Sequence, residues 1–144
     1  MTAKVHDTAL HASKYGVNVK EVSADLGKIV ARKTKVVRKL VLGIKAKLTA
    51  QKVTLVQGEA YIQDAHTVRC GEELYECEQM IVCTGSATFI PPVAGLDSVS
   101  YWTHREALDN KEIPSSLVIV GGGVIGMEFA SFFHCLGVKV TVVE

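Results

Sequence analysis

Three glycines near the end of the chain have a spacing that could bind phosphate. Gly121, Gly123 and Gly126 form a GxGxxG pattern directly after the apolar run Leu117–Val120. In a dinucleotide-binding turn the first glycine permits the tight turn and the second lets the backbone approach the pyrophosphate. The third lets the helix pack closely on the strand. The pattern therefore predicts a site for a dinucleotide.

The positive potential for such a site needs no basic side chain. Val124 and Ile125 follow the second glycine and open the expected helix, so backbone amides and the helix dipole face the phosphates. Glu144 stands where the acidic residue of this fold meets the ribose hydroxyls. Its carboxylate would accept hydrogen bonds from a free 2'-hydroxyl and repel a 2'-phosphate, which favours NAD over NADP as the cofactor.

The elements that must position these residues follow the glycines in order. Apolar residues recur with helical spacing from Glu128 to Leu136, and Gly137 is expected to end that helix. Val138–Val143 then reads as a second strand. The order strand, helix, strand predicts a βαβ unit with the glycine-rich turn at its centre.

Composition sets the broad class of the protein. The chain has 144 residues, of which 48% are hydrophobic, and its net charge is +1. This length corresponds to about one domain, but most of the chain precedes the glycine-rich turn, so two partial units are expected. The balanced charge gives no general attraction to nucleic acid or membrane. No apolar stretch has the length of a membrane span and the N-terminus lacks the apolar core of a signal peptide, so we expect a cytoplasmic protein.

A long helix is expected after Ser23 or Asp25, either of which could cap it. Apolar residues from Leu26 to Leu48 recur at steps of three and four, which predicts one buried face. The opposite face is basic and has no acidic residue between Asp25 and Glu59. A nucleic-acid site is an alternative interpretation, but no aromatic residue is interleaved for base stacking. The sequence therefore favours a solvated face, formed by Lys28, Arg32, Lys33, Lys35, Arg38, Lys39, Lys45 and Lys47.

The middle of the chain has the pattern of strands. Short alternating segments between Tyr61 and Cys77 indicate a small antiparallel meander. Met80–Cys83 is continuously apolar, as a buried parallel strand should be, and it runs into Thr84–Ser86. Pro91 and Pro92 then mark a linker because proline continues neither helix nor strand.

The cysteines and histidines indicate no metal site. The four cysteines have irregular spacing that matches neither a zinc site nor a CxxC pair, and we expect free, buried thiols. The five histidines are scattered.

The order of these segments resembles the flavin-dependent pyridine nucleotide-disulfide oxidoreductases. The likeness rests on Cys83–Ser86, the proline pair, Tyr101–Thr103, Ile113–Pro114 and Val118–Glu128. It implies an α/β fold in two parts. Residues 1–90 would be a partial FAD-binding domain with a long helix, parallel strands and the meander. Residues 91–144 would be a linker and the opening βαβ unit of a Rossmann-type NAD-binding domain.

The resemblance also implies roles for individual residues. Thr84, Gly85 and Ser86 would close the FAD site, and the backbone of Gly58, Glu59 and Ala60 would meet the FAD adenine. Glu128 matches a helix carboxylate that forms an ion pair on the flavin side. The family's CxxxxC redox disulfide and its histidine-glutamate pair have no counterpart between Met1 and Glu144, so no catalytic residue is assigned and the chain resembles an inactive central fragment.

Within the family the chain looks most like the members that oxidise dihydrolipoamide with NAD. The implied partner of the parent protein is an acyltransferase that carries dihydrolipoamide. A related flavoprotein such as mercuric reductase, or a free-standing nucleotide-binding module without catalysis, remains an alternative. Because the strands Leu117–Val120 and Val138–Val143 need cover on both faces, we also expect a homo-oligomer.

Overall fold

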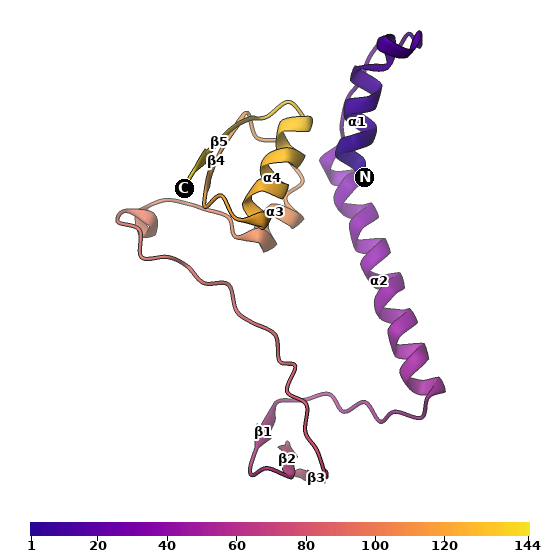
Figure 1. Cartoon of the computed structure of the whole chain (residues 1–144), viewed down its shortest axis with the longest axis vertical. Helices are drawn as coiled ribbons and strands as arrows, with labels where there is room; N and C mark the ends of the chain where they lie inside the picture. Colours follow the sequence, from indigo (N-terminus) through magenta and orange to yellow (C-terminus); the bar gives the residue numbers. More distant parts are fainter. The chain divides into compact units, whose positions relative to one another are not determined.

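The structure, a computed structural model, describes residues 1–144 and divides them into two compact units. The first unit contains residues 1–37 and 94–144, and the second contains residues 38–93. Figure 1 follows the chain through its helices and strands, and each unit is described here by itself. The overall class is mixed α/β with one parallel and one antiparallel sheet, as the sequence predicts.

The βαβ unit expected from the glycine pattern is present in the first unit. Strand β4 spans Ser116–Val120, helix α4 spans Val124–Cys135 and strand β5 spans Lys139–Val143. The two strands are parallel and pair in register from Ser116 with Lys139 to Val120 with Val143. Figure 1 shows α4 beside this pair of strands. Gly137 adopts a φ of +87° after the helix, which explains why the helix ends there.

The core of the first unit is built around one aromatic side chain. Phe133 of α4 is fully buried and packs with Leu26, Leu136 and Val138. Three further rings surround Phe133, with centroid distances of 5.1 Å to Phe132, 6.3 Å to Phe129 and 6.4 Å to Trp102. Aromatic rings at these separations attract one another beyond the effect of their buried area. This cluster therefore stabilises the packing of α4 against its neighbours.

Only one face of the parallel sheet is covered. Leu117 and Ile119 are half-buried on the side of α4, and Leu117 packs against the Phe133 cluster. Val118 and Val120 alternate with them and are each 63% exposed. Because successive side chains of a strand point to opposite faces, the second face of this sheet is an exposed apolar surface.

Four further elements belong to the first unit. Helix α1 spans Thr2–Leu10 and contacts α4, and the 3-10 helix η1 spans Ala12–Tyr15. The 3-10 helix η2 spans Leu96–Ser98, and helix α3 spans His104–Asp109.

Helix α2 spans Leu26–Ala50 and extends from the first unit into the second. Asp25 caps it, since its Oδ1 accepts a hydrogen bond from the Lys28 amide at 2.9 Å, which confirms one of the two expected caps. The prediction of a continuous buried face is wrong. Leu26 and Val30 are buried, whereas the later apolar side chains, from Val37 to Ile44, are exposed. The amphipathic spacing is present, but no neighbouring element packs on it beyond the first turns.

The second unit contains the expected antiparallel meander. Strands β1 (Ala60–Ile62), β2 (Thr67–Cys70) and β3 (Glu73–Glu76) form one sheet in the order β1-β2-β3. The predicted parallel strand Met80–Cys83 is absent, and Ile81 is 88% exposed. A buried parallel strand needs hydrogen-bonding neighbours and cover on both faces. In this chain β2 pairs with β1 and β3, and β4 pairs with β5, so this segment has no partner strand.

Candidate nucleotide-binding site

The glycine-rich turn joins the end of β4 to the start of α4. Gly121 has a φ of +105°, a conformation that favours glycine, and its amide donates to the carbonyl oxygen of Val143 at 2.8 Å. Gly123 is the N-cap residue of α4. A Cβ atom built on Gly123 would meet no atom within 4 Å. The turn therefore presents open backbone at the N-terminal end of a helix, where an anion is favoured.

Val124 and Ile125 form the first turn of α4. Their side chains are exposed, and no side chain caps this end of the helix. Since the first amides of a helix have no partner inside it, these groups are available to a ligand. The cofactor-binding role of the two residues stays a prediction.

Gly126 has the packing role predicted from its position in the pattern. A Cβ atom at this residue would lie 2.3 Å from the carbonyl oxygen of Gly121 and 3.3 Å from Cγ2 of Ile119. Contacts this short leave no room for a side chain at Gly126 unless the backbone shifts. The glycine thus sets how closely α4 approaches the turn and β4.

Glu144 follows β5 directly and lies beside the turn. Its Oε2 accepts a hydrogen bond from the Gly122 amide. A Cβ atom on Gly122 would lie 2.8 Å from the same carboxylate oxygen. The structure therefore brings together Glu144 and the glycine-rich turn, 22 residues apart in the sequence, and leaves the carboxylate exposed.

Helix α3 begins with a capping box that the sequence analysis missed. Thr103 is the N-cap residue, and the Arg105 amide donates to its Oγ1 at 3.2 Å. Oε2 of Glu106 accepts from the Thr103 amide at 2.7 Å and from the Thr103 hydroxyl at 2.6 Å. The hydroxyl bond is the main cause that holds the pKa of Glu106 below its ordinary value. The threonine followed three residues later by glutamate was the available signal.

Glu128, which the resemblance places on the flavin side, lies in the second turn of α4. Its side chain is exposed and forms no ion pair within the chain. The structure places this carboxylate on the helix that follows the glycine-rich turn. Its expected lysine partner belongs to the redox-disulfide region, which has no counterpart in this sequence.

The expected FAD residues all lie in the second unit. Gly58 and Glu59 line a shallow cavity of about 370 Å³ beside the meander, and Ala60 begins β1. Thr84, Gly85 and Ser86 lie in an exposed segment outside regular structure, where Gly85 has a φ of +73°. These three residues do not line the cavity, so the structure does not join the two FAD segments there.

The basic face of α2 has contacts that the sequence did not reveal. Nζ of Lys33 donates to the carbonyl oxygen of Leu108 at 3.1 Å and pairs with Asp109, both in α3. Lys28 lies 3.3 Å from Asp25. Lys33 therefore connects two elements of the first unit, and its side chain is only partly solvated.

The four cysteines are free, as expected, but the prediction that they are buried is wrong. Cys83 is exposed and Cys70, Cys77 and Cys135 are half-buried. Cys70 ends β2, Cys135 ends α4, and Cys77 and Cys83 lie outside helices and strands, so all four thiols retain contact with solvent.

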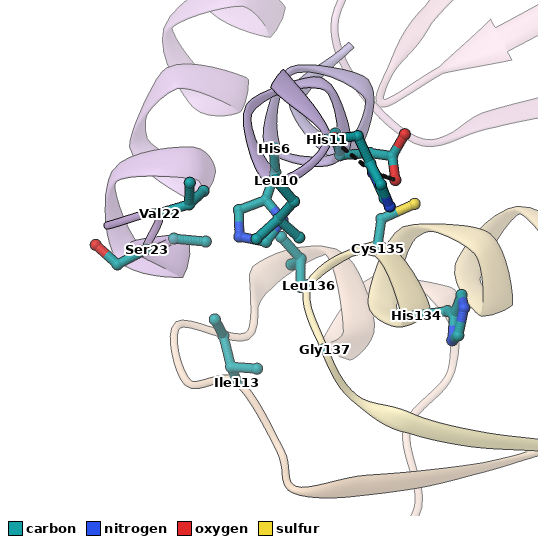
Figure 2. A pocket seen from close by; sticks show the side chains of 12 residues that line it. His6, Leu10, His11, Val22, Ser23, Ile113, His134, Cys135, Leu136 and Gly137 are labelled. Carbon is teal, nitrogen blue, oxygen red and sulfur yellow. Dashed lines mark hydrogen bonds and ion pairs between the residues drawn. The ribbon is translucent and has the colours of Figure 1, made fainter. Parts of the chain in front are cut away.

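A second cavity of about 440 Å³ lies in the first unit between α1 and the end of α4. Figure 2 shows His6 and Leu10 of α1 opposite Cys135 and Leu136. His11 Nδ1 lies 2.9 Å from the backbone oxygen and 3.2 Å from Oδ1 of Asp7. The structure contains no group of three or more histidine, cysteine, aspartate or glutamate side chains that could hold a metal ion.

The strand β4, the glycine-rich turn, the closely packed helix α4 and the carboxylate that follows β5 thus lie together. The family model described as pyridine nucleotide-disulphide oxidoreductase matches residues 3–144. The chain belongs to this family. FAD and NAD, the cofactors expected from the sequence, are the cofactors of the family.

The relatives of this chain include dihydrolipoyl dehydrogenases. The protein of Acholeplasma laidlawii is 38% identical over 148 residues, which cover 99% of this chain and 44% of the relative. The protein of Bacillus subtilis (strain 168) is 36% identical over 149 residues, which cover 99% of this chain and 32% of the relative. The chain thus spans less than half the length of these curated relatives.

Solved structures agree with this assignment to the oxidoreductase family. The HOCl-induced flavoprotein disulfide reductase RclA from Escherichia coli superimposes with a TM-score of 0.76 at 29% identity, covering 96% of this chain and 31% of RclA. Its Cu(II) complex gives a TM-score of 0.74 at 28% identity over the same shares of the two chains. In the present structure, no helix combines the length and the apolar character needed to cross a membrane.

Proposed function

We propose that this chain supplies cofactor-binding walls of an FAD-dependent, NAD-linked oxidoreductase that oxidises dihydrolipoamide. The observation that carries the proposal is the geometry of the glycine-rich turn. Gly123 leaves open space at the start of α4, and Glu144 is hydrogen-bonded to the adjacent Gly122 amide. A pyrophosphate at the turn and a ribose at the carboxylate would satisfy both groups at once.

Each part of the chain has a role in this proposal. Residues 1–90 would form part of the FAD-binding domain, where the backbone of Gly58, Glu59 and Ala60 meets the adenine and Thr84, Gly85 and Ser86 close the site. Residues 91–144 would form the linker and the first βαβ unit of the NAD-binding domain. Its NAD-binding residues are Gly121, Gly123, Val124, Ile125, Gly126 and Glu144.

The chemistry of electron transfer would come from the bound cofactors, with NAD as the hydride acceptor. The residues of this chain bind and orient these cofactors. The α4 amides neutralise phosphate charge, Glu144 selects the unphosphorylated ribose, and Glu128 supplies a carboxylate for an ion pair on the flavin side. No CxxxxC segment occurs in the sequence, so we expect the isolated chain to be inactive towards lipoamide. NADH-dependent lipoamide reduction by the purified chain, free of host enzyme, would contradict this expectation.

The relatives support the proposed substrate and partner of the parent protein. The curated relatives from Acholeplasma laidlawii and Bacillus subtilis are dihydrolipoyl dehydrogenases, which supports an acyltransferase bearing dihydrolipoamide as the partner. A flavoprotein such as mercuric reductase and a nucleotide-binding module without catalysis are the competing functions. The presence of a CxxxxC helix upstream in the parent gene would favour the oxidoreductases over the binding module.

The binding proposal is tested by a substitution that should block the ligand and spare the fold. Gly123→Val places a side chain in space that no protein atom occupies, at a φ of −64° that other residues adopt. We expect NADH binding, measured by nucleotide fluorescence, to be lost while the circular dichroism spectrum is retained. Gly43→Ala, in the middle of α2 with open space around it, is the matched control and should bind NADH normally. Equal NADH affinity in wild type and Gly123→Val would overturn the proposal.

A further inference from the structure

The backbone amide of Gly122, in the middle of the glycine-rich turn, is occupied by a side chain of the protein itself. It donates a hydrogen bond to Oε2 of Glu144, which joins the end of β5 to the turn. On either side of Gly122 the turn is open, because Cβ atoms added to Gly121 and Gly123 would meet nothing within 4 Å. The GxGxxG pattern assigns no role to its second position. The structure thus gives Gly122 a partner that the pattern does not contain.

This contact places a negative charge at a turn that is otherwise suited to anions. Glu144 is exposed and forms no ion pair within the chain. Strand β4, the turn and α4 as far as Phe133 contain no lysine, arginine or histidine that could offset the charge.

The carboxylate lies close to the amides that could bind a phosphate. The amides of Val124 and Ile125 open α4 and have no partner inside the helix. The Cα atoms of residues 122 and 124 are at most about 7.6 Å apart, since each step along the chain spans about 3.8 Å. A phosphate at these amides is therefore repelled by the carboxylate on the Gly122 amide.

We infer that Glu144 is an internal competitor for the glycine-rich turn: its carboxylate holds the Gly122 amide and excludes free inorganic phosphates, and it admits a phosphate that arrives attached to a ribose. The inference rests on the proposed function, because it concerns the same dinucleotide site. Ribose hydroxyls donate to the carboxylate and replace the hydrogen bond that it gives up at Gly122. Inorganic phosphate and pyrophosphate carry no ribose and meet the repulsion alone.

The absence of a side chain at residue 122 keeps the carboxylate in place. A Cβ atom on Gly122 would lie 2.8 Å from Oε2 and 3.4 Å from Cδ of Glu144, and its three nearest atoms all belong to Glu144. Gly122 does not have a positive φ, so its backbone conformation accepts alanine. Because the carboxylate ends a flexible side chain, alanine would turn it away from the amide. Substitution at either residue therefore breaks the same contact in a different way.

The first test compares inorganic pyrophosphate with NADH as ligands of the full chain. Isothermal titration calorimetry without divalent cations gives both dissociation constants for wild type and Glu144→Ala. We expect Glu144→Ala to bind pyrophosphate about tenfold more tightly, the effect of removing one charge about 7 Å from a multiply charged anion in a site open to water. The preference for NADH over pyrophosphate should fall by at least the same factor, because the acceptor for the ribose is also lost. Gly43→Ala, in the middle of α2, is the control and should match wild type.

The inference and the proposed function fail on different results of this test. Equal or weaker pyrophosphate binding by Glu144→Ala than by wild type, or no detectable binding by the variant, would overturn the inference. If wild type binds NADH in that case, the dinucleotide site stands and the internal competitor does not. A gain in pyrophosphate affinity without NADH binding by wild type would count against the proposed function and leave the exclusion of free phosphate standing.

The second test is a double-mutant cycle that keeps the charge of Glu144 and moves it. Gly122→Ala should raise the affinity for pyrophosphate by less than Glu144→Ala does, because the methyl group turns the carboxylate away without removing it. In the Glu144→Ala background the same substitution should have no effect, since the atoms that it displaces are absent. Circular dichroism checks the fold of each variant. An equal effect of Gly122→Ala in both backgrounds would refute the role of this contact.

Discussion

Gly126 and Gly121 are packed so closely that a Cβ atom on Gly126 would lie 2.3 Å from the carbonyl oxygen of Gly121. The neighbour is backbone and cannot rotate away. We therefore expect Gly126→Ala to lower the free energy of unfolding of the first unit by about 1–3 kcal/mol, the usual cost of overpacking. Urea unfolding followed by circular dichroism measures the change.

Gly43→Ala is the matched control for this prediction. Gly43 lies in the interior of α2, and an added Cβ atom would meet nothing within 4 Å. Alanine should stabilise the helix here by about 1 kcal/mol. Equal effects of the two substitutions would show that the contact with Gly121 does not limit the packing of α4.

Phe133 should be the most sensitive position in the core of the first unit. Its side chain is fully buried and contacts three other rings. Phe133→Ala should lower the free energy of unfolding of the first unit by about 3–5 kcal/mol. Trp102 is the single tryptophan of the chain and lies in this cluster, so its fluorescence reports unfolding of the same core. Phe89, 80% exposed, is the control, and a comparable loss in Phe89→Ala would contradict the assignment of the core.

Glu144 should determine the choice between the two nicotinamide cofactors. Its carboxylate sits at the Gly122 amide, where it would repel a 2'-phosphate. Glu144→Arg should narrow or invert the preference for NADH over NADPH, because the arginine would attract the 2'-phosphate that the glutamate repels. The ratio of the two dissociation constants, measured by nucleotide fluorescence, is the readout. The same ratio in wild type and variant would mean that another residue makes the choice.

The start of α3 should respond to acid through Glu106. Hydrogen bonds, the first of them from the Thr103 hydroxyl, hold the pKa of Glu106 below its ordinary value of 4.5. The carboxyl group of Glu106 binds a proton more weakly in the folded state than in the unfolded state. Its contribution to the stability of the folded state is therefore present above the unfolded pKa and is lost as pH falls through the folded pKa. NMR titration of the Glu106 carboxyl group and amide exchange across α3 should show this acid-induced fraying. Glu106→Gln should remove the acid-induced fraying of α3. If the fraying persists in this variant, another titrating group causes it.

The uncovered face of the β4–β5 sheet should cause association. Val118 and Val120 are exposed on parallel strands of a kind normally buried on both faces. We expect the isolated chain to form oligomers at micromolar concentration and Val120→Lys to shift it towards monomer. Sedimentation velocity distinguishes these outcomes. A stable, compact wild-type monomer would refute the expectation.

The sequence by itself determined the elements whose causes are local. The glycine spacing, the apolar run before it and the helical repeat after it specify β4, α4 and β5 through backbone sterics and side-chain periodicity. The turn residues Gly121 and Gly126 could be assigned structural roles for the same reason. Asp25 as a helix cap and the antiparallel meander also follow from short-range patterns.

Only the tertiary structure decided which apolar surfaces are covered. The repeat from Val37 to Ile44 predicts a face of a helix, but burial requires a second element, and these residues remain exposed. Met80–Cys83 has the composition of a parallel strand, yet a strand exists only with hydrogen-bonding neighbours. The contact of Lys33 with Asp109 joins residues 76 positions apart in the chain. Such contacts depend on the path of the whole backbone, which local residue patterns do not encode.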